Sequence, residues 1–231
     1  MFPNKIAVIS GDNTFSAKFD GTGDYMDITA VDLGTSNTIS WWHKRTGAED
    51  SVPQENLEIP IGSTGYGGGG YYVYWGVNVD DTFYVRIANA TVYFNLGSTL
   101  FNALIGKWCH VVLVRTEQTK WKLYINGAVV DEEQTMGGTP AATVIDRIGA
   151  GSRGEAEPDS YDVEGLMDEV SLFTSVKSDA DVLAMYNNGV PPNLIGASGI
   201  VHWWKFEENA LDSIGTNHGT LVNVKFSTDS P

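Results

Sequence analysis

Residues 165–189 read GLMDEVSLFTSVKSDADVLAMYNNG, and they predict a strand followed by a short helix. The apolar run over 166–173 has the length and composition of a strand in a sandwich core. Ser178 can then cap a helix, with Asp181 three residues on, and the next apolar residues have helical spacing. A glycine and two prolines end the pattern. We therefore expect one short helix near residues 178–187 in a chain that is otherwise built from strands.

Outward from this stretch, the sequence is dominated by short apolar and aromatic runs that are joined by turn residues. TISWWHKR (38–45) has apolar residues on both faces, as a strand inside a sandwich does. Asn126 and Gly127 lie between two apolar runs, which is a strong hairpin signal. Further strands are expected at 71–77, 83–87, 108–115, 121–125, 128–130 and 145–148. This succession predicts an all-β, two-sheet antiparallel sandwich.

The composition indicates a globular domain with an acidic surface. The 231 residues suit one large sandwich, and the seven Trp, ten Tyr and nine Phe supply a large core. The single cysteine, Cys109, cannot form an intrachain disulfide and is expected to be a buried strand thiol. The formal net charge of −15 repels nucleic acids and anionic membranes and suits a bound cation.

The sequence shows no recognisable targeting segment. The N-terminal residues lack the apolar core of a signal peptide, and no run reaches the roughly 18 apolar residues of a membrane span. If the protein works on a virion surface or another extracellular surface, it therefore needs another route to that surface. The chain would reach it by phage assembly and lysis, by dedicated secretion, or after removal of a signal.

In their order, these segments resemble the laminin-G-like domains of the concanavalin A-like lectin/glucanase superfamily. FSAKFDGTGDYMDI (15–28) is similar to the strand–turn–strand that carries the family's F-D-G-x-x-D-Y pattern, and TISWWHKR to the strand after it. GKWCHVVLVRT (106–116) and LYINGAVVD (123–131) are similar to two later strands. The stretch quoted first is similar to the family's closing strand and helix. The shared order over residues 15–189 implies a concanavalin A-like jelly roll.

The C-terminal part departs from the family's usual order. We place the sandwich at 1–190, a linker at 191–199 and a C-terminal segment at 200–231. WWKFEENALDSIGTNHGTLVNV (203–224) resembles the segment that normally opens such domains, and here it comes last. Either the domain is circularly permuted, or the segment opens a truncated second domain or packs on a neighbouring subunit. Domain termini lie close together and the aromatic residues need burial, so we expect packing within the same domain.

The best-known enzymes of this superfamily, the glucanases, need two carboxylates that face each other across a cleft, and their usual motif places these on one face of a strand. Their E-x-D-x-x-E and E-x-D-x-E patterns do not occur in this sequence, and the acidic runs at 131–133 and 155–162 are expected to be solvated. The four histidines show no zinc-site spacing. We therefore expect no catalytic residues and no enzyme. A polysaccharide-cleaving enzyme with atypical residues remains an alternative.

The resemblance also implies a calcium ion, because relatives commonly hold one with oxygen ligands. The candidate ligands are Asp20, Asp24, Asp168, Asp212 and Asn217. They are chosen by family position and not by spacing. For the first two, which lie in DGTGD, the alternative is a hairpin turn that needs Gly and Asp.

Aromatic residues beside the glycine run GYGGGG (65–70) suggest a recess for a ligand. The predicted ligand-binding residues are Tyr66, Tyr71, Tyr72, Trp75 and Arg153. The alternative is that the aromatic residues belong to the core and that the glycines form a flexible loop or a tight sheet corner.

These observations predict a non-catalytic carbohydrate-binding or adhesion module on a virion, as a phage capsid or tail decoration, or on an extracellular surface. Its partner would be a glycan or cell-surface polysaccharide, held by stacking on an exposed aromatic ring and by polar hydrogen bonds. The alternative is a purely structural decoration protein that contacts other virion or surface proteins or forms a homo-oligomer. No nucleic-acid partner is expected.

Overall fold

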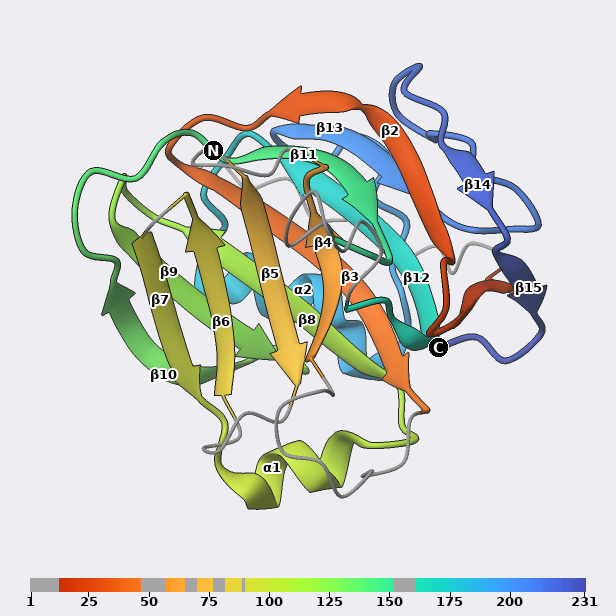
Figure 1. Ribbon diagram of the computed structural model, residues 1–231, viewed down its shortest axis with the longest axis horizontal. Coiled ribbons are helices and arrows are strands. Elements are labelled where there is room, and N and C mark those ends of the chain that lie inside the picture. Colours follow the sequence, from red (N-terminus) through yellow and green to blue (C-terminus); the bar gives the residue numbers. More distant parts are fainter. Residues whose placement is uncertain (1–12, 47–56, 65–69, 77–81, 89, 152–160) are drawn as a thin grey trace.

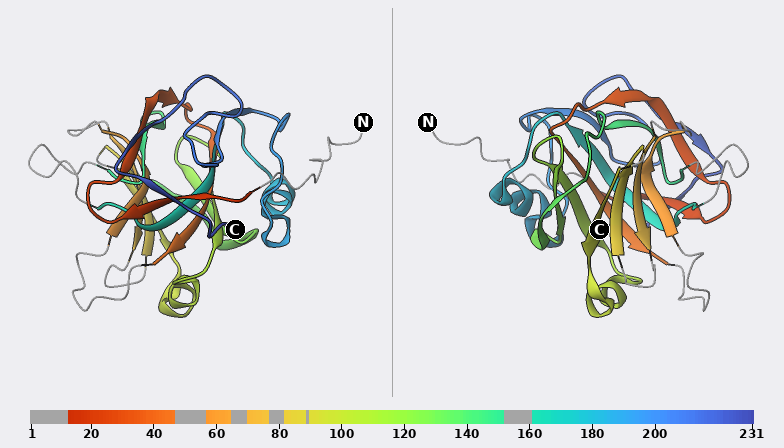
Figure 2. Two further views of the ribbon diagram at one scale, coloured as in Figure 1. Left: turned by 90° about the vertical axis from the view of Figure 1, so that its right-hand side faces the viewer. Right: turned by 60° about the vertical axis from the view of Figure 1, so that its left-hand side comes forward.

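The apolar runs of the sequence form two antiparallel sheets that stack face to face as a sandwich (Figure 1). The computed structural model describes residues 13–46, 57–64, 70–76, 82–88, 90–151 and 161–231. Two further views show the layers and the helices outside them (Figure 2). The predicted all-β, two-sheet jelly-roll sandwich is therefore confirmed.

The first sheet contains eight of the described strands. They are β1 (Ser16–Asp20), β3 (Asn37–Arg45), β8 (Cys109–Arg115), β9 (Lys120–Ile125), β10 (Ala128–Thr135), β12 (Glu164–Phe173), β13 (Ile200–Trp204) and β15 (Lys225–Ser227). Their order is β10-β9-β8-β3-β12-β1-β15, and β13 also pairs with β12.

The second sheet contains seven of the described strands. They are β2 (Tyr25–Asp32), β4 (Leu57–Gly62), β5 (Tyr71–Gly76), β6 (Thr82–Ile87), β7 (Ala90–Asn95), β11 (Val144–Ile148) and β14 (Thr220–Val222). Their order is β14-β2-β11-β4-β5-β6-β7. This sheet faces the viewer in Figure 1.

Aromatic side chains from both sheets fill the space between the layers. Trp41 of β3 stacks on Phe83 of β6 with ring centroids 6.4 Å apart, and both are fully buried. Trp75 of β5 packs edge-on against the same Phe83 at 5.7 Å. Large rings bury much apolar area, at about 25 cal/mol per Å². The sandwich therefore holds together without a disulfide, and Cys109 is a buried free thiol as predicted.

The predicted helix is present as α2 (Asp179–Tyr186), on the outer side of the first sheet. Its capping box is complete, because Ser178 Oγ accepts from Asp181 N while the Asp181 carboxylate accepts from Ser178 N. Its Val182 packs on a cluster of β8 and β9 side chains. The helix ends at its C-cap residue Asn187, whose φ of 44° is left-handed, two residues before Gly189, which was expected to end it.

A second helix, α1 (Gly97–Leu104), closes one end of the sandwich and is not among the predicted elements (Figure 1). Its N-cap residue, Leu96, makes no side-chain hydrogen bond, so the sequence lacks a start signal there. A short 3-10 turn, η1 (Asn187–Gly189), follows α2. No helix in the described ranges is long and apolar enough to cross a membrane.

The C-terminal segment 200–231 contributes strands to both sheets. β12 pairs with β1 along its first half and with β13 along its second half, so these two strands share one edge of β12. β15 pairs with β1, and β14 pairs with β2 of the other sheet. The buried Trp204 donates from Nε1 to the carbonyl oxygen of Asn217 at 2.9 Å. In this structure, the segment is therefore a part of the sandwich.

Candidate functional site

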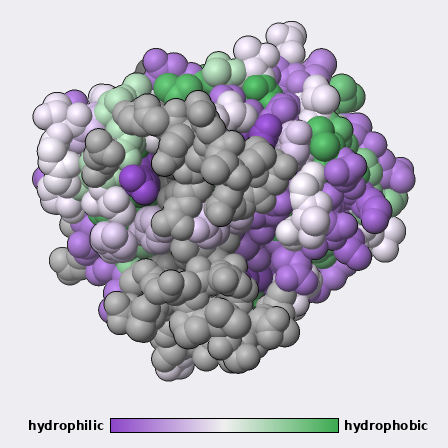
Figure 3. Space-filling view, viewed as in Figure 1, coloured by the Kyte–Doolittle hydropathy of each residue, from purple (hydrophilic) through white to green (hydrophobic). Residues whose placement is uncertain are grey.

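The outer face of the second sheet carries a group of tyrosine side chains. On β6, three buried residues alternate with Tyr84 and Arg86, which therefore lie on the outer face. On β7, Tyr93 lies on that face between the buried Val92 and Phe94. The described residues on this side of the molecule are mainly hydrophilic or near neutral (Figure 3). Aromatic rings thus stand on an otherwise polar surface.

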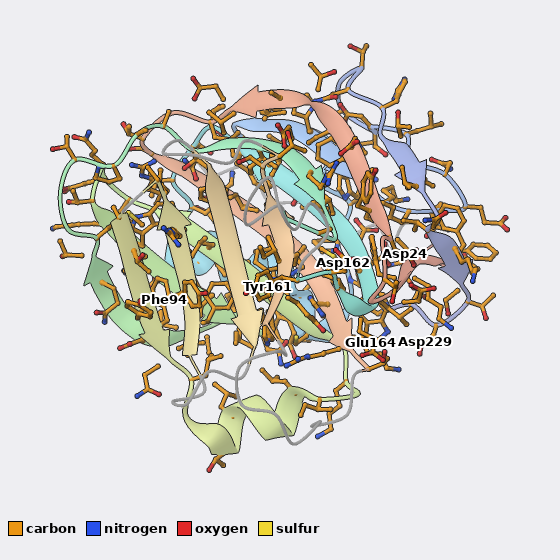
Figure 4. All side chains as sticks on the ribbon, viewed as in Figure 1. Asp24, Phe94, Tyr161, Asp162, Glu164 and Asp229 are labelled. Atoms are coloured by element: carbon orange, nitrogen blue, oxygen red, sulfur yellow. The ribbon has the colours of Figure 1, made fainter. Side chains whose placement is uncertain are left out.

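Tyr84 and Tyr93, together with Tyr161 from the turn before β12, form what we call the tyrosine ledge. The rings of Tyr84 and Tyr93 have centroids 5.4 Å apart, and Tyr93 is 57% exposed. Tyr84 and Tyr161 both pack on the buried Ile59 of β4. Figure 4 shows Tyr161 over the middle strands of the sheet. One exposed ring therefore rests on a firmly packed base.

The backbone around Tyr161 is held in an unusual conformation. Its φ is 76°, a left-handed value that bulky residues rarely adopt. Its carbonyl oxygen accepts from the backbone N of Ile59 at 2.8 Å. A Cβ on Gly151 would lie 2.6 Å from Ile59 Cδ1, so only glycine permits this close approach. Such strain persists where the surroundings fix it, and it is common at functional sites.

The carboxylates on the neighbouring part of this face are already engaged. Asp27 of β2 accepts from Arg147 Nε at 2.8 Å, and that guanidinium also lies 3.9 Å from the centroid of the Tyr25 ring. Asp146 accepts from the backbone and the hydroxyl of Thr64. Asp27 and Asp146 are therefore both held by partners within the protein.

A serine–histidine pair lies elsewhere, beneath α2. Ser40 Oγ is 2.8 Å from His110 Nε2, and both residues are buried. Burial lowers the pKa of His110 to about 3, so the ring is neutral at pH 7. The cavity beside the pair measures about 10 Å³, which is room for one water molecule and not for a substrate. We assign the pair to the structure of the sheet face.

The predicted ligand-binding residues do not come together on the ledge. Tyr71 and Trp75 are buried in the core, where their rings are closed to a ligand. Tyr72 pairs with Arg86 in the β5–β6 ladder, and the structure does not describe its side chain. Tyr66 and Arg153 lie outside the described residues.

The sequence contained a signal for the ledge that the prediction did not use. FYVRI in β6 and TVYFN in β7 each alternate core residues with Tyr or Arg. Period two separates the two faces of a strand, but it does not say which face is covered. The covered face at β5 is the one that carries Tyr71 and Trp75.

The predicted calcium ligands lie in separate parts of the fold. The carboxylate oxygens of Asp212 already have partners within the protein. They accept from the backbone N of Trp203, Ile214 and Asn217 and interact with His202 Nδ1. Burial alone would raise the pKa of Asp212, but these hydrogen bonds and one from Gly215 hold it below its ordinary value. The Asn217 amide is also used, bonding both the N and the O of Thr29.

The other three predicted ligands give no cluster either. Asp20 and Asp24 build the β1–β2 turn, with Asp20 N donating to Asp24 Oδ2 at 2.8 Å. Figure 4 shows Asp24 beside the start of β2. Asp168 is buried inside β12. Within the described ranges, no group of three or more Asp, Glu, His or Cys side chains could hold a metal ion. These side chains do not fit one calcium site, and calcium binding stays a prediction.

Asp168 instead belongs to a buried acidic junction with Glu169. Burial raises the pKa of both carboxyls, that of Glu169 to about 8. Trp203 Nε1 donates to Glu169, and Glu207 accepts from the backbone N of Thr14. The junction thus connects β12 to the C-terminal segment and to the start of the described chain.

This strand order, with two stacked antiparallel sheets, defines a concanavalin A-like jelly-roll sandwich. The chain belongs to the Laminin_G_3 family of the concanavalin A-like lectin/glucanases superfamily, whose model matches residues 20–183. A search of curated proteins finds no match to the sequence.

Solved structures with low sequence identity share the fold. A protein of Bacteroides ovatus described as carbohydrate-binding has a TM-score of 0.67 and 14% identity, covering 93% of this chain and 59% of that one. A heptameric SAP-like pentraxin from Limulus polyphemus has a TM-score of 0.57 and 14% identity, covering 93% and 95%. Domain 4 of the Geobacillus stearothermophilus arabinanase AbnA, in complex with arabinotriose, has a TM-score of 0.53 and 15% identity, covering 80% and 82%. The chain therefore spans 59% of the length of the first of these structures.

Proposed function

We propose that this chain is a non-catalytic carbohydrate-binding or adhesion module whose contact surface is the tyrosine ledge. The observation that carries the proposal is Tyr93, whose ring is 57% exposed and lies beside that of Tyr84 on the outer face of the second sheet. An exposed ring on a rigid sheet can stack on the apolar face of a sugar, while polar neighbours bond its hydroxyls. The ring has little conformational freedom to lose on binding, because Tyr84 supports it from the side.

The fold comparisons support the same class of ligand. The Bacteroides ovatus protein is described as carbohydrate-binding, and the arabinanase domain was solved with arabinotriose. The engaged carboxylates Asp27 and Asp146 favour binding over hydrolysis at this face, because a glycosidase needs one acid and one base or nucleophile free to act.

The finer part of the proposal is the setting, a virion or another extracellular surface. The sandwich uses no intrachain disulfide, so it can fold in a reducing compartment where particles assemble and remain stable after release. Immunogold labelling of particles and of cell surfaces would distinguish these settings.

The function is tested by glycan binding of the ledge variants. We expect Y93A to weaken binding to the best glycan of an array by about fivefold or more, because an exposed aromatic contact is worth about 1 kcal/mol or more. Y93F keeps the ring and should bind nearly as well as the parent. L183A removes an exposed apolar side chain from α2, outside the second sheet, and serves as the matched control. If no glycan binds the parent, or if Y93A binds like L183A, the ledge is not the contact surface.

A further inference from the structure

One arginine on the same face as the tyrosine ledge has N–H donors without a hydrogen-bond acceptor among the described residues. Arg86 lies two residues after Tyr84 on β6, so the two side chains share a face about 7 Å apart along the strand. Arg86 Nε donates to the carbonyl oxygen of Ala88 at 3.0 Å. Its two terminal amino groups have no hydrogen-bond or ion-pair partner among the described residues.

The other described arginines are all engaged. Arg45 pairs with Glu58 in the core, and Arg147 pairs with Asp27. Arg115 donates to several backbone carbonyl oxygens near the end of β8. A guanidinium is strongly polar, and a half-buried one normally finds acceptors in the protein or in its ligand. Arg86 therefore differs from the rest in having an open pair of donors.

The position of the Arg86 side chain is fixed by the turn that it bonds. Ala88 has a left-handed φ of 53° and donates from its backbone N to the carbonyl oxygen of Gly70 at 2.9 Å. The Nε bond to Ala88 thus ties the guanidinium to the β6–β7 turn. Two parallel N–H groups that are held in this way match the two oxygens of a carboxylate.

We propose that the ledge selects carboxylated sugars, such as uronic acids, with Arg86 binding the carboxylate while the sugar ring stacks on Tyr84 and Tyr93. This inference rests on the proposed function, since it names the ligand class of the same site. Arg86 supplies charge complementarity on a chain whose net charge is −15. At about 0.15 M salt the Debye length is about 8 Å, so distant acidic residues are largely screened while a direct contact is not.

The first test uses the unaltered protein and pairs of polymers that differ only at the carboxyl group, which is a carboxylate in one and a neutral CH2OH group in the other. Polygalacturonate and alginate are each compared with their carboxyl-reduced, neutral forms at 0.15 M salt. We expect the carboxylated form to bind about tenfold or more tightly, as a charge-assisted bidentate contact implies. Equal binding of both forms overturns the inference and leaves the proposed function standing. Binding to neither these polymers nor neutral glycans, laminarin and arabinan included, overturns the proposed function itself.

The second test assigns the selectivity to Arg86. R86Q should lose the preference for the carboxylated polymer. R86K should keep only part of it, because lysine has the positive charge without the planar pair of N–H donors of a guanidinium. K107Q removes an exposed positive charge near α1 and should behave like the parent. A preference that persists in R86Q, or that is lost equally in K107Q, would overturn the assignment. Thermal melting checks that R86Q is folded, and the polymer comparison on the parent decides the selectivity even if it is not.

Discussion

Glu169 is an acidic residue that the fold places almost entirely out of water. It is 4% exposed, its φ is 53°, and it lies where the β12–β3 pairing shifts register. Its carboxyl accepts from Trp203 Nε1, and Asp168, Glu207 and Lys205 are the charged groups near it. Ionisation of this buried carboxyl costs free energy in the folded state, so the stability of the protein should depend on pH.

The E169Q variant should remove a pH dependence of folding. Burial raises the pKa of Glu169 from 4.5 to about 8, so the folded state binds more protons than the unfolded state between these values. The stabilisation is complete below pH 4.5 and is lost as pH rises towards 8. Each pKa unit is worth about 1.4 kcal/mol. We expect the free energy of unfolding of E169Q, measured in urea, to rise relative to that of the parent by a few kcal/mol between pH 5 and pH 8.

The matched control for this titration is E208Q, a change at an exposed carboxylate of the same C-terminal segment. Its free energy of unfolding should follow the parent across the pH range. A difference between E169Q and the parent that does not change with pH would show that Glu169 is not protonated in the folded protein at neutral pH.

At the scale of single elements, α2 depends on a local cap as well as on packing. S178A removes the acceptor for Asp181 N and half of the capping box. Loss of such a cap costs about 1 kcal/mol. We expect urea unfolding to show this loss. S213A is the control, because Ser213 is exposed and its hydroxyl makes no hydrogen bond with the described residues. Equal stability of the two variants would mean that packing alone holds the helix.

The contrast between the two helices shows which elements a sequence can predict. α2 is predictable because its start signal is a local pair of side chains, Ser178 and Asp181. α1 has an apolar N-cap residue, no acidic residue in its first turn and no basic residue in its last, so tertiary packing decides it. The strands that were predicted from period two and turn residues are present in both sheets, whereas β4 and β7 of the second sheet were not predicted.

The candidate site was less predictable than the fold for a related reason. Tyr71 and Tyr84 lie in similar aromatic strands, yet the first is buried and the second faces outward. The identity of the covered face depends on how the two sheets stack, which is a long-range property. The same limit applies to the calcium residues, because family position assigned Asp212 a ligand role while its oxygens serve a turn.

At the scale of the whole molecule, the two ends of the described chain meet. Ser230 Oγ donates to the carbonyl oxygen of Asn13 at 3.2 Å, and Ser16 Oγ donates to that of Asp229 at 2.7 Å. Directly beyond these contacts, β15 pairs with β1. A permuted gene order, in which the last segment comes first as in typical family members, is therefore compatible with this geometry. The permuted origin of the chain stays a prediction.

A rearranged chain makes that prediction testable in the laboratory. Residues 196–231 are placed first, joined by a short Gly/Ser linker to residues 13–195, so that the new ends lie beside Ile195, which is 70% exposed. The cut opens one surface turn, and the join spans ends that already touch. We expect cooperative unfolding within about 2–3 kcal/mol of the unpermuted 13–231 chain, since loop closure changes little with loop length. A chain that ends at residue 199 lacks β13, β15 and β14, which pair with β12, β1 and β2, and should lose cooperative unfolding. Two outcomes would contradict this prediction. The rearranged chain could aggregate while the 13–231 chain folds, or the shortened chain could unfold as cooperatively as the 13–231 chain. Either result would mean that the C-terminal segment is not an integral part of the sandwich that can be placed at either end of the chain.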